Sequence, residues 1–178
     1  MVEVETDENL QDYVSVKTNN NTLYVSTNED DINHSTKNNI FITLKNINSI
    51  DINSVGKIEC KTVLVLERLT LDYDGVGKTV LNIDCGQFNA DIASVGSLVI
   101  KGKAKSANIE HAGVGSVSAF DFKVGYLSLN HSGIGSVEAY ASKELSITSS
   151  GIGSVRFKGP AEIKKLETSG LGSVKRAD

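Results

Sequence analysis

The sequence predicts an all-β protein, a right-handed, single-stranded parallel β-helix (β-solenoid) with about seven coils of about 19 residues each. Three observations predict it: a glycine-rich corner recurs at near-constant spacing, the same apolar columns surround each copy, and the runs between corners alternate with period two. A unit this short cannot bury its hydrophobic face alone, whereas stacked units bury one continuous core. The right-handed winding follows from the usual preference of parallel β connections.

The corner is a six-residue element, for example "INSVGK" at 52–57 and "HSGIGS" at 131–136. Its second glycine recurs in steps of 21, 19, 19, 20, 18 and 19 residues. A tight corner needs either a positive φ or a missing Cβ, and glycine provides both. The predicted structural corner residues are Gly56, Gly77, Gly96, Gly115, Gly135, Gly153 and Gly172.

One copy of the corner, "DYDGVGKT" at 72–79, ends like a nucleotide-phosphate loop. Such a loop needs a glycine five residues before Gly77 and a helix after it. Asp72 occupies the glycine position, and the following "TVLNIDC" alternates like a strand. The stretch is therefore interpreted as a structural corner and not as a nucleotide site.

Three apolar columns repeat with the corner. One lies four residues before the first corner position, one lies between the two corner positions, and one lies two residues after the second glycine. Stacking of the coils is expected to bury these columns in the common core. The columns run from Ile50 to Leu166, from Val55 to Leu171 and from Ile58 to Val174.

Residues 1–45 lack the repeat and are predicted to form N-terminal strands and a hairpin, which serve as opening coils or as a cap, while 46–178 form one continuous solenoid domain. Strands are expected at 13–16 and 22–27, joined as a hairpin, and at 39–45. The polar run at 28–39, which contains His34, is expected to be an exposed loop. The C-terminal coil has no evident cap, and Lys175 and Arg176 stand near its strand edge.

Composition excludes several classes of partner. A net charge of −4 without a basic stripe argues against nucleic acid and against an anionic membrane surface. Aromatic residues make up 6% of the chain and tryptophan is absent, so stacking platforms for sugars are few. No apolar run approaches the roughly 18 residues of a membrane span. The opening "MVEVETDENL" lacks the regions of a signal peptide, which fits a cytoplasmic protein or an exported one whose signal was removed.

No catalytic residue, cofactor or metal is expected from the sequence. An outward column of Asp51, Asp72, Asp91 and Glu110 is a weak candidate for a cation strip, with Ca²⁺ as the matching hard cation, and a solvated face is the favoured alternative. His111 and His131 should stack on neighbouring coils and pack at the corner. Cys60 and Cys85 match no zinc or redox spacing and are expected to be small buried hydrophobes, or a disulfide if the protein is exported.

The run "LYVST…IFITLKNINSIDINSVG", followed by repeated "SGIGSV" corners, resembles the head GIN domain of bacterial auto-transporter adhesins over roughly 10–175. The resemblance implies a right-handed β-solenoid of mostly unassigned function, with no set of catalytic residues. It also implies a protein that is exported, periplasmic or associated with the outer membrane of a bacterium. The acidic residue that family members often carry after the corner glycines is serine or lysine here, so no role for it is transferred.

The expected function is a non-enzymatic interaction or adhesion module of the cell envelope that presents a rigid surface to an unknown protein or a surface glycan. The first alternative is a structural β-helix that self-associates end to end through its C-terminal coil. The second alternative is an enzyme acting on polysaccharide along the acidic column.

Overall fold

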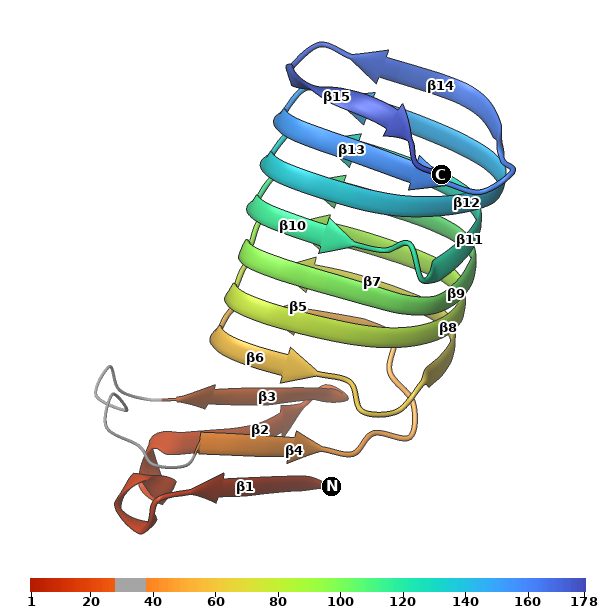
Figure 1. The fold of residues 1–178 in the computed structure, drawn as a ribbon. Coiled ribbons are helices and arrows are strands. Elements are labelled where there is room, and N and C mark those ends of the chain that lie inside the picture. Colours follow the sequence, from red (N-terminus) through yellow and green to blue (C-terminus); the bar gives the residue numbers. More distant parts are fainter. Residues whose placement is uncertain (28–37) are drawn as a thin grey trace. The chain divides into compact units, whose positions relative to one another are not determined.

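The computed structural model describes residues 1–27 and 38–178 and divides into two compact units, Met1–Lys45 and Asn46–Asp178 (Figure 1). Most of the loop expected at 28–39, including His34, lies outside the described residues. Its last two positions, Asn38 and Asn39, already belong to a strand.

The first unit contains two antiparallel strand pairs and one 3₁₀ helix, η1 (Glu8–Tyr13). Strands β2 (Val14–Asn19) and β3 (Thr22–Thr27) form a hairpin, and β1 (Val2–Thr6) pairs with β4 (Asn38–Ile42). The two loop residues of the hairpin, Asn20 and Asn21, both have a positive φ (47° and 62°). This is the loop that matches the twist of paired strands, and asparagine tolerates it better than most residues. No described side chain of this unit is buried.

The second unit is a right-handed parallel β-solenoid, as predicted (Figure 1). Its strands all pair in parallel within one 11-stranded sheet that wraps around the core. They are β5 (Ser49–Ile52), β6 (Val55–Glu59), β7 (Leu64–Tyr73), β8 (Val76–Ile92), β9 (Val95–His111), β10 (Val114–Ser118), β11 (Phe122–His131), β12 (Ile134–Ser149), β13 (Ile152–Lys158), β14 (Glu162–Thr168) and β15 (Leu171–Arg176).

The coils stack in register at the corner. Gly96 of β9 is paired with Gly77 of β8 on one side and with Gly115 of β10 on the other. All the predicted corner glycines except Gly172 have φ between 133° and 145°. A Cβ on any of them except Gly56 would lie within 1.8–2.1 Å of the carbonyl oxygen of the preceding corner glycine. Glycine is therefore required both by backbone conformation and by the close approach of successive coils.

The core is continuous from Ile52 to Ala161 and consists mainly of aliphatic side chains. Two of the three predicted apolar columns contribute to it, represented by Leu71 and Val117. Phe88 and Phe122 pack edge to face inside it, with ring centroids 5.4 Å apart. Alternation along each strand sends every second side chain inward, which is why period two marks these runs.

The remaining apolar column, which lies between the two corner positions, was expected to be buried in the core. The structure shows that it is not in the core, so this expectation was wrong. Val55 is 84% exposed, and Val114, on an interior coil, is 48% exposed. The chain turns sharply around the corner glycine, so the side chain between the two corner positions lies on the outside of the bend. Inward and outward alternation is interrupted there, and an apolar residue is left facing solvent.

Candidate functional site

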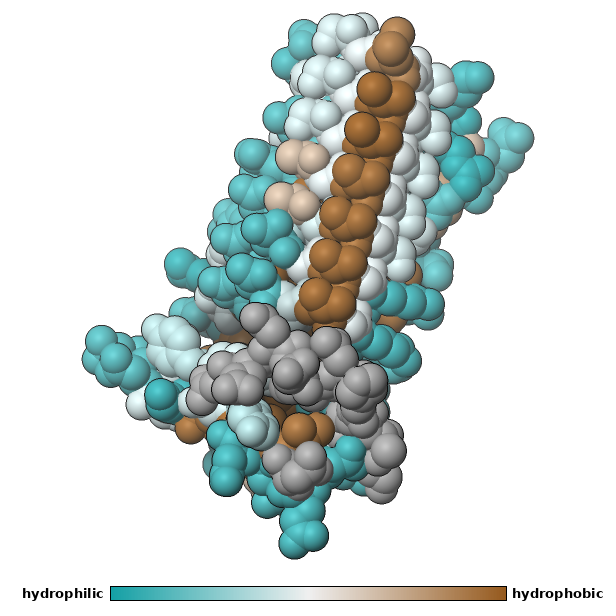
Figure 2. Space-filling model, turned by 90° about the vertical axis from the view of Figure 1, so that its left-hand side faces the viewer, coloured by the Kyte–Doolittle hydropathy of each residue, from teal (hydrophilic) through white to brown (hydrophobic). Residues whose placement is uncertain are grey.

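The outer corner of the solenoid carries a line of exposed aliphatic side chains, which we call the apolar ridge. Figure 2 shows it as a continuous stripe along the corner, bordered by residues of near-neutral hydropathy. The five interior members are each 47–50% exposed. The ridge consists of Val55, Val76, Val95, Val114, Ile134, Ile152 and Leu171.

The packing of the corner explains why the ridge stands out. The second corner glycines border it on one side, and at Gly115 an added Cβ would lie 1.9 Å from the carbonyl oxygen of Gly96. The first corner position is similarly tight, since a Cβ on Gly133 would lie 2.3 Å from the carbonyl oxygen of Gly113. The positions that flank the ridge therefore carry only glycine or, at Ser54 and Ser94, serine, and these small residues leave the ridge members uncovered within the chain.

The acidic column lies where the sequence places it. Asp51 pairs in register with Asp72, Asp72 with Asp91, and Asp91 with Glu110, and all four side chains are exposed. The column supplies one carboxylate per coil, and the next two coils carry Asn130 and Thr148 in its place. Among the residues described, no group of three or more His, Cys, Asp or Glu side chains is arranged to hold a metal ion. The cation strip stays a prediction.

His111 and His131 stack on neighbouring coils inside the core. Their rings lie 5.0 Å apart at an angle of 12°, and their Nδ1 atoms are 2.9 Å apart. One Nδ1 must donate its N–H and the other must accept it, so two neutral rings share this hydrogen bond only in opposite tautomers. Burial, and secondarily His131, lowers the pKa of His111 to about 4, and burial also lowers the pKa of His131. The pair is a packing feature of the corner, as the sequence suggested.

The two cysteines are unpaired. Cys85 is buried, and burial, with the Asp84 carboxylate beside it, raises the pKa of its thiol to about 11. Cys60 is half-buried, not buried as expected, and its Sγ donates to the carbonyl oxygen of Thr62 at 3.0 Å. A thiol with a raised pKa is a poor nucleophile, so Cys85 is suited to packing rather than to catalysis.

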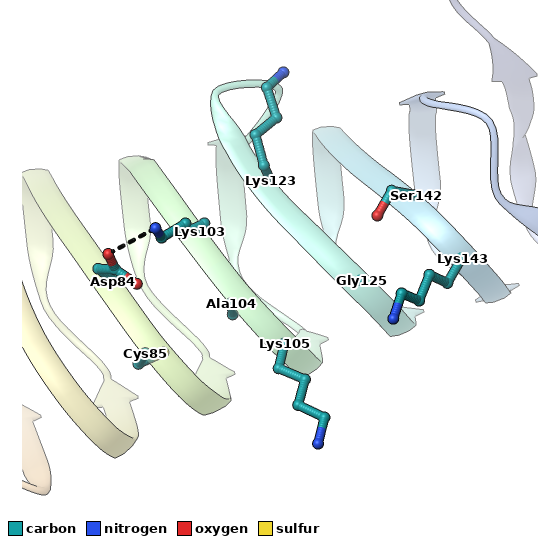
Figure 3. Close-up of a pocket in the computed structure, with 9 residues that line it drawn as sticks. All are labelled: Asp84, Cys85, Lys103, Ala104, Lys105, Lys123, Gly125, Ser142 and Lys143. Carbon is teal, nitrogen blue, oxygen red and sulfur yellow. Dashed lines mark ion pairs between the residues drawn. The ribbon is translucent and has the colours of Figure 1, made fainter.

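A shallow hollow of about 360 Å³ opens on the outer face of the β8, β9, β11 and β12 strands. Small residues, including Ala104 and Gly125, leave the space, and four lysines surround it with a single carboxylate (Figure 3). The lining residues are Asp84, Cys85, Lys103, Ala104, Lys105, Lys123, Gly125, Ser142 and Lys143. Sequence reasoning missed this basic surface, although the alternation of lysine in "KGKAK" at 101–105 places Lys101, Lys103 and Lys105 on one face of a strand.

The corner serines form a column of equivalent positions, with Ser116 of β10 paired to Ser97 and to Ser136. Hydrolysis needs one nucleophile set apart from its neighbours and oriented by a base. The stacked His111 and His131 are buried, so neither is presented to a substrate at the surface. The fold and its surface together define a β-solenoid repeat domain. Its outer aliphatic, acidic and serine side chains each form a column with one residue per coil.

The chain belongs to the family described as "Putative auto-transporter adhesin, head GIN domain", which matches residues 1–161. Membership of this family of adhesin domains is consistent with a cell-surface or exported protein and with a non-enzymatic role. In the part of the chain that the structure describes, no helix has the length and apolar character needed to cross a membrane. A search of curated proteins found no match.

Several solved structures share the fold, among them the following three. A "putative adhesin" from Bacteroides fragilis is 25% identical with a TM-score of 0.94, and the match covers 99% of this chain and 82% of that one. A "putative adhesin" from Parabacteroides distasonis is 23% identical with a TM-score of 0.73, covering 99% and 83%. A "putative lipid binding protein" from Parabacteroides distasonis is 23% identical with a TM-score of 0.68, covering 99% and 84%.

Proposed function

We propose that this protein is a non-enzymatic interaction or adhesion module of the bacterial cell envelope, exported to the periplasm or associated with the outer membrane. Its solenoid presents a rigid surface to a partner, a protein or a surface glycan. Adhesin-family membership supports the setting. The observation that carries the proposal is the apolar ridge, an uninterrupted line of exposed aliphatic side chains along the solenoid.

Exposed apolar surface is costly in water, and contiguous exposed patches on soluble domains mark places where another molecule binds. The ridge is straight and fixed in spacing because each member sits on its own coil, with Val95, Val114 and Ile134 paired in register. Successive parallel strands are hydrogen-bonded about 4.8 Å apart, so neighbouring members of the ridge are held at that spacing. A partner therefore meets a preformed surface and does not have to order it.

Adhesion to isolated envelopes tests the proposal. Beads coated with the protein should be retained on intact bacterial cells and on their purified envelopes, and the triple variant Val95→Thr, Val114→Thr and Ile134→Thr should be retained less. Threonine keeps the branched shape and the strand preference while adding a hydroxyl. Because these side chains are already half-exposed, the free energy of unfolding of the variant should lie within about 1 kcal/mol of the wild-type value.

The matched control for this experiment is Leu129→Ala, which removes a buried side chain of the core. It should lower stability by about 2–5 kcal/mol and leave retention by the folded protein unchanged. No retention of the wild-type protein on cells or envelopes would contradict the proposal. If the ridge variant were retained as well as the wild type, the ridge would not be part of the binding surface.

A specific observation also favours end-to-end self-association as a second candidate. No side chain of β14 is buried, and β15 is the last strand of the sheet order, with Leu171 79% exposed. An open strand edge can pair with a second copy. Light scattering across a wide concentration range tests it, since a molecular mass that rises with concentration supports self-association and a constant monomer mass contradicts it.

A further inference from the structure

We infer that the face around the hollow on β9, β11 and β12 binds an acidic polysaccharide, a glycan chain bearing carboxylates at intervals. The cations that line the hollow are Lys103, Lys105, Lys123 and Lys143. On the neighbouring β13, Arg156 and Lys158 lie against the ring of Phe120, whose carbonyl oxygen accepts a hydrogen bond from Lys123. Because the setting at the envelope is that of the proposed function, the inference rests on it and identifies the class of glycan.

The first observation is the excess of cations at the hollow. Its lining holds four ammonium groups and one carboxylate, that of Asp84, and this carboxylate is already paired with Lys103 at 3.1 Å. Three ammonium groups thus remain around the hollow without a carboxylate among its lining residues. The local charge is opposite to the net charge of −4 of the whole chain. A surface of this kind attracts an anion to one place on an otherwise acidic protein.

The second observation is that like charges are stacked. Lys103 and Lys123 are register partners on adjacent parallel strands, and alternation directs both outward. Like charges opposed across a strand pair repel one another. Their ammonium groups turn apart, that of Lys103 to the Asp84 carboxylate and that of Lys123 to the Tyr140 ring and the carbonyl oxygen of Phe120. An anion bound between the two side chains would offset the repulsion that remains.

The third observation is that several of these cations are held against aromatic rings. Lys123 Nζ lies 4.0 Å from the centroid of Tyr140 and donates to the carbonyl oxygen of Phe120 at 2.7 Å. Lys158 Nζ lies 5.1 Å from the centroid of Phe120, and Lys143 Nζ lies 5.2 Å from that of Tyr126. Such contacts restrain flexible lysines, so less freedom is lost when their remaining N–H groups bind a ligand. Aromatic residues are scarce in the sequence, yet three of them gather on this face.

The directions of the lysines select the kind of anion. Figure 3 shows Lys105 and Lys123 extending away from each other, and Lys143 lying along the strand near Gly125. The ammonium groups therefore border the hollow and do not converge on a single point, which suits a chain with spaced charges better than one small anion. The Ser142 hydroxyl on the same lining donates to the carbonyl oxygen of Val124 at 3.2 Å and can accept a hydrogen bond from a sugar hydroxyl.

Other polyanions fit less well. Duplex DNA carries a negative charge about every 1.7 Å and is bound by surfaces that are densely basic. Here Glu138 lies among the cations and is paired with Arg156, and Asp121 adjoins Phe122 at the start of β11. A flat anionic membrane would meet the bordering side chains but not the small residues at the floor of the hollow. Sparse carboxylates on a flexible glycan match this mixture of charges.

Binding to polygalacturonic acid tests the inference, with its fully methyl-esterified form as the uncharged control on the same backbone. We expect the wild-type protein to bind the acid form, to bind the ester at least about tenfold more weakly, and to lose affinity as NaCl rises from about 50 to about 200 mM. The variant Lys105→Gln/Lys143→Gln should bind the acid form about tenfold more weakly or worse. The control Lys57→Gln/Lys78→Gln changes the net charge equally at stacked corner positions and should bind like the wild type.

Failure to bind the acid form, equal binding of the ester, or an equal loss in the two variants would overturn the inference. Tighter binding of single-stranded DNA or of phosphatidylglycerol vesicles than of polygalacturonic acid would overturn the choice of partner. The envelope assay separates the two proposals. If beads are retained on envelopes and Lys105→Gln/Lys143→Gln is retained equally, the glycan inference fails while the proposed function stands. If no beads are retained, the proposed function fails.

Discussion

At the scale of single residues, the buried histidine pair is the most sensitive group in the molecule. His111 and His131 share one hydrogen bond between Nδ1 atoms at 2.9 Å, and His131 Nε2 has no hydrogen-bond partner in the structure. A proton added to the accepting ring would set two N–H groups against each other and charge a ring in the core. The pair is therefore stable only when both rings are neutral.

This predicts acid sensitivity. The pKa of His111 is lowered to about 4 from an ordinary value of 6.5 by burial and then by His131, so between these values the unfolded chain binds more protons than the folded one. The stability is fully present above about pH 6.5 and is lost as pH falls toward 4, by about 3 kcal/mol in total. Urea unfolding at several pH values between 5 and 7.5 measures it.

The control for the histidine experiment is His111→Ile/His131→Ile. The same column carries Ile52 and Ile92 on other coils, so isoleucine fits the position. The variant should have a smaller pH dependence between pH 5 and 6.5, where most carboxylates are still ionised. An unchanged slope would show that other groups cause the acid sensitivity.

The two thiols should differ in reactivity. The pKa of Cys85 is raised to about 11, mainly by burial, so little thiolate is present near pH 8, whereas Cys60 is half-buried. An aromatic disulfide reagent should therefore modify Cys60 rapidly and Cys85 slowly, with both reacting at once in urea. Mass spectrometry of the proteolytic peptides shows which cysteine reacts in the fast phase and which in the slow phase of the modification. Cys60→Ser should retain only the slow phase, and two equally fast phases would contradict the burial of Cys85.

At the scale of the element, the repeated corner fixes both the bend of each coil and its distance to the next. Gly115 and Gly56 have nearly the same φ, 145° and 139°. A Cβ at Gly115 would lie 1.9 Å from the carbonyl oxygen of Gly96, whereas a Cβ at Gly56 would meet nothing within 4 Å. The two positions separate the backbone requirement from the packing requirement.

Alanine at the two corners should therefore have unequal effects. Gly56→Ala should cost about 1–3 kcal/mol, the strain of a side chain at positive φ. Gly115→Ala carries the same strain and in addition forces two coils apart, so it should lose most of the folding stability or fail to fold. Thermal unfolding followed by circular dichroism compares them. Equal melting temperatures would show that φ alone decides the need for glycine.

The limits of sequence prediction also appear at the scale of the element. Spacing and period two were enough to predict the solenoid, because each coil repeats one strand pattern and parallel register follows from stacking. The ridge residues were predicted to be buried because the alternation of side chains predicts their direction only along a straight strand. Val114 lies where the chain bends, and its side chain is exposed. The basic hollow was missed because Lys123 and Lys143 lie beside an irregularity in the pairing of β11 with β12, where the register shifts between Val124 and Tyr126.

At the scale of the whole molecule, the two units differ in what holds them together. In the solenoid, buried side chains form one core that extends over successive coils, from Ile52 to Ala161. In the first unit, no described side chain is buried, and its strands occur in pairs. In a repeat domain, each coil is stabilised by its neighbours, so interior coils are held from two sides and an outermost coil from one.

Hydrogen exchange should therefore reveal a gradient of protection along the chain. Amides of β8, β9 and β12, which pair with strands on both sides, should exchange slowest, near the rate set by global unfolding. Amides of β14 and β15, whose side chains are largely exposed, should exchange faster, and those of the described residues of Met1–Lys45 should exchange fastest because none of their side chains is buried. Peptide-resolved mass spectrometry after dilution into D₂O measures the gradient.

The dependence of this protection on protein concentration tests self-association. If β14 and β15 became protected as protein concentration rose, their edge would be covered by a second copy, and end-to-end association would be favoured over an isolated solenoid. Uniform protection across both units at every concentration would contradict the one-sided stabilisation of the outer coils.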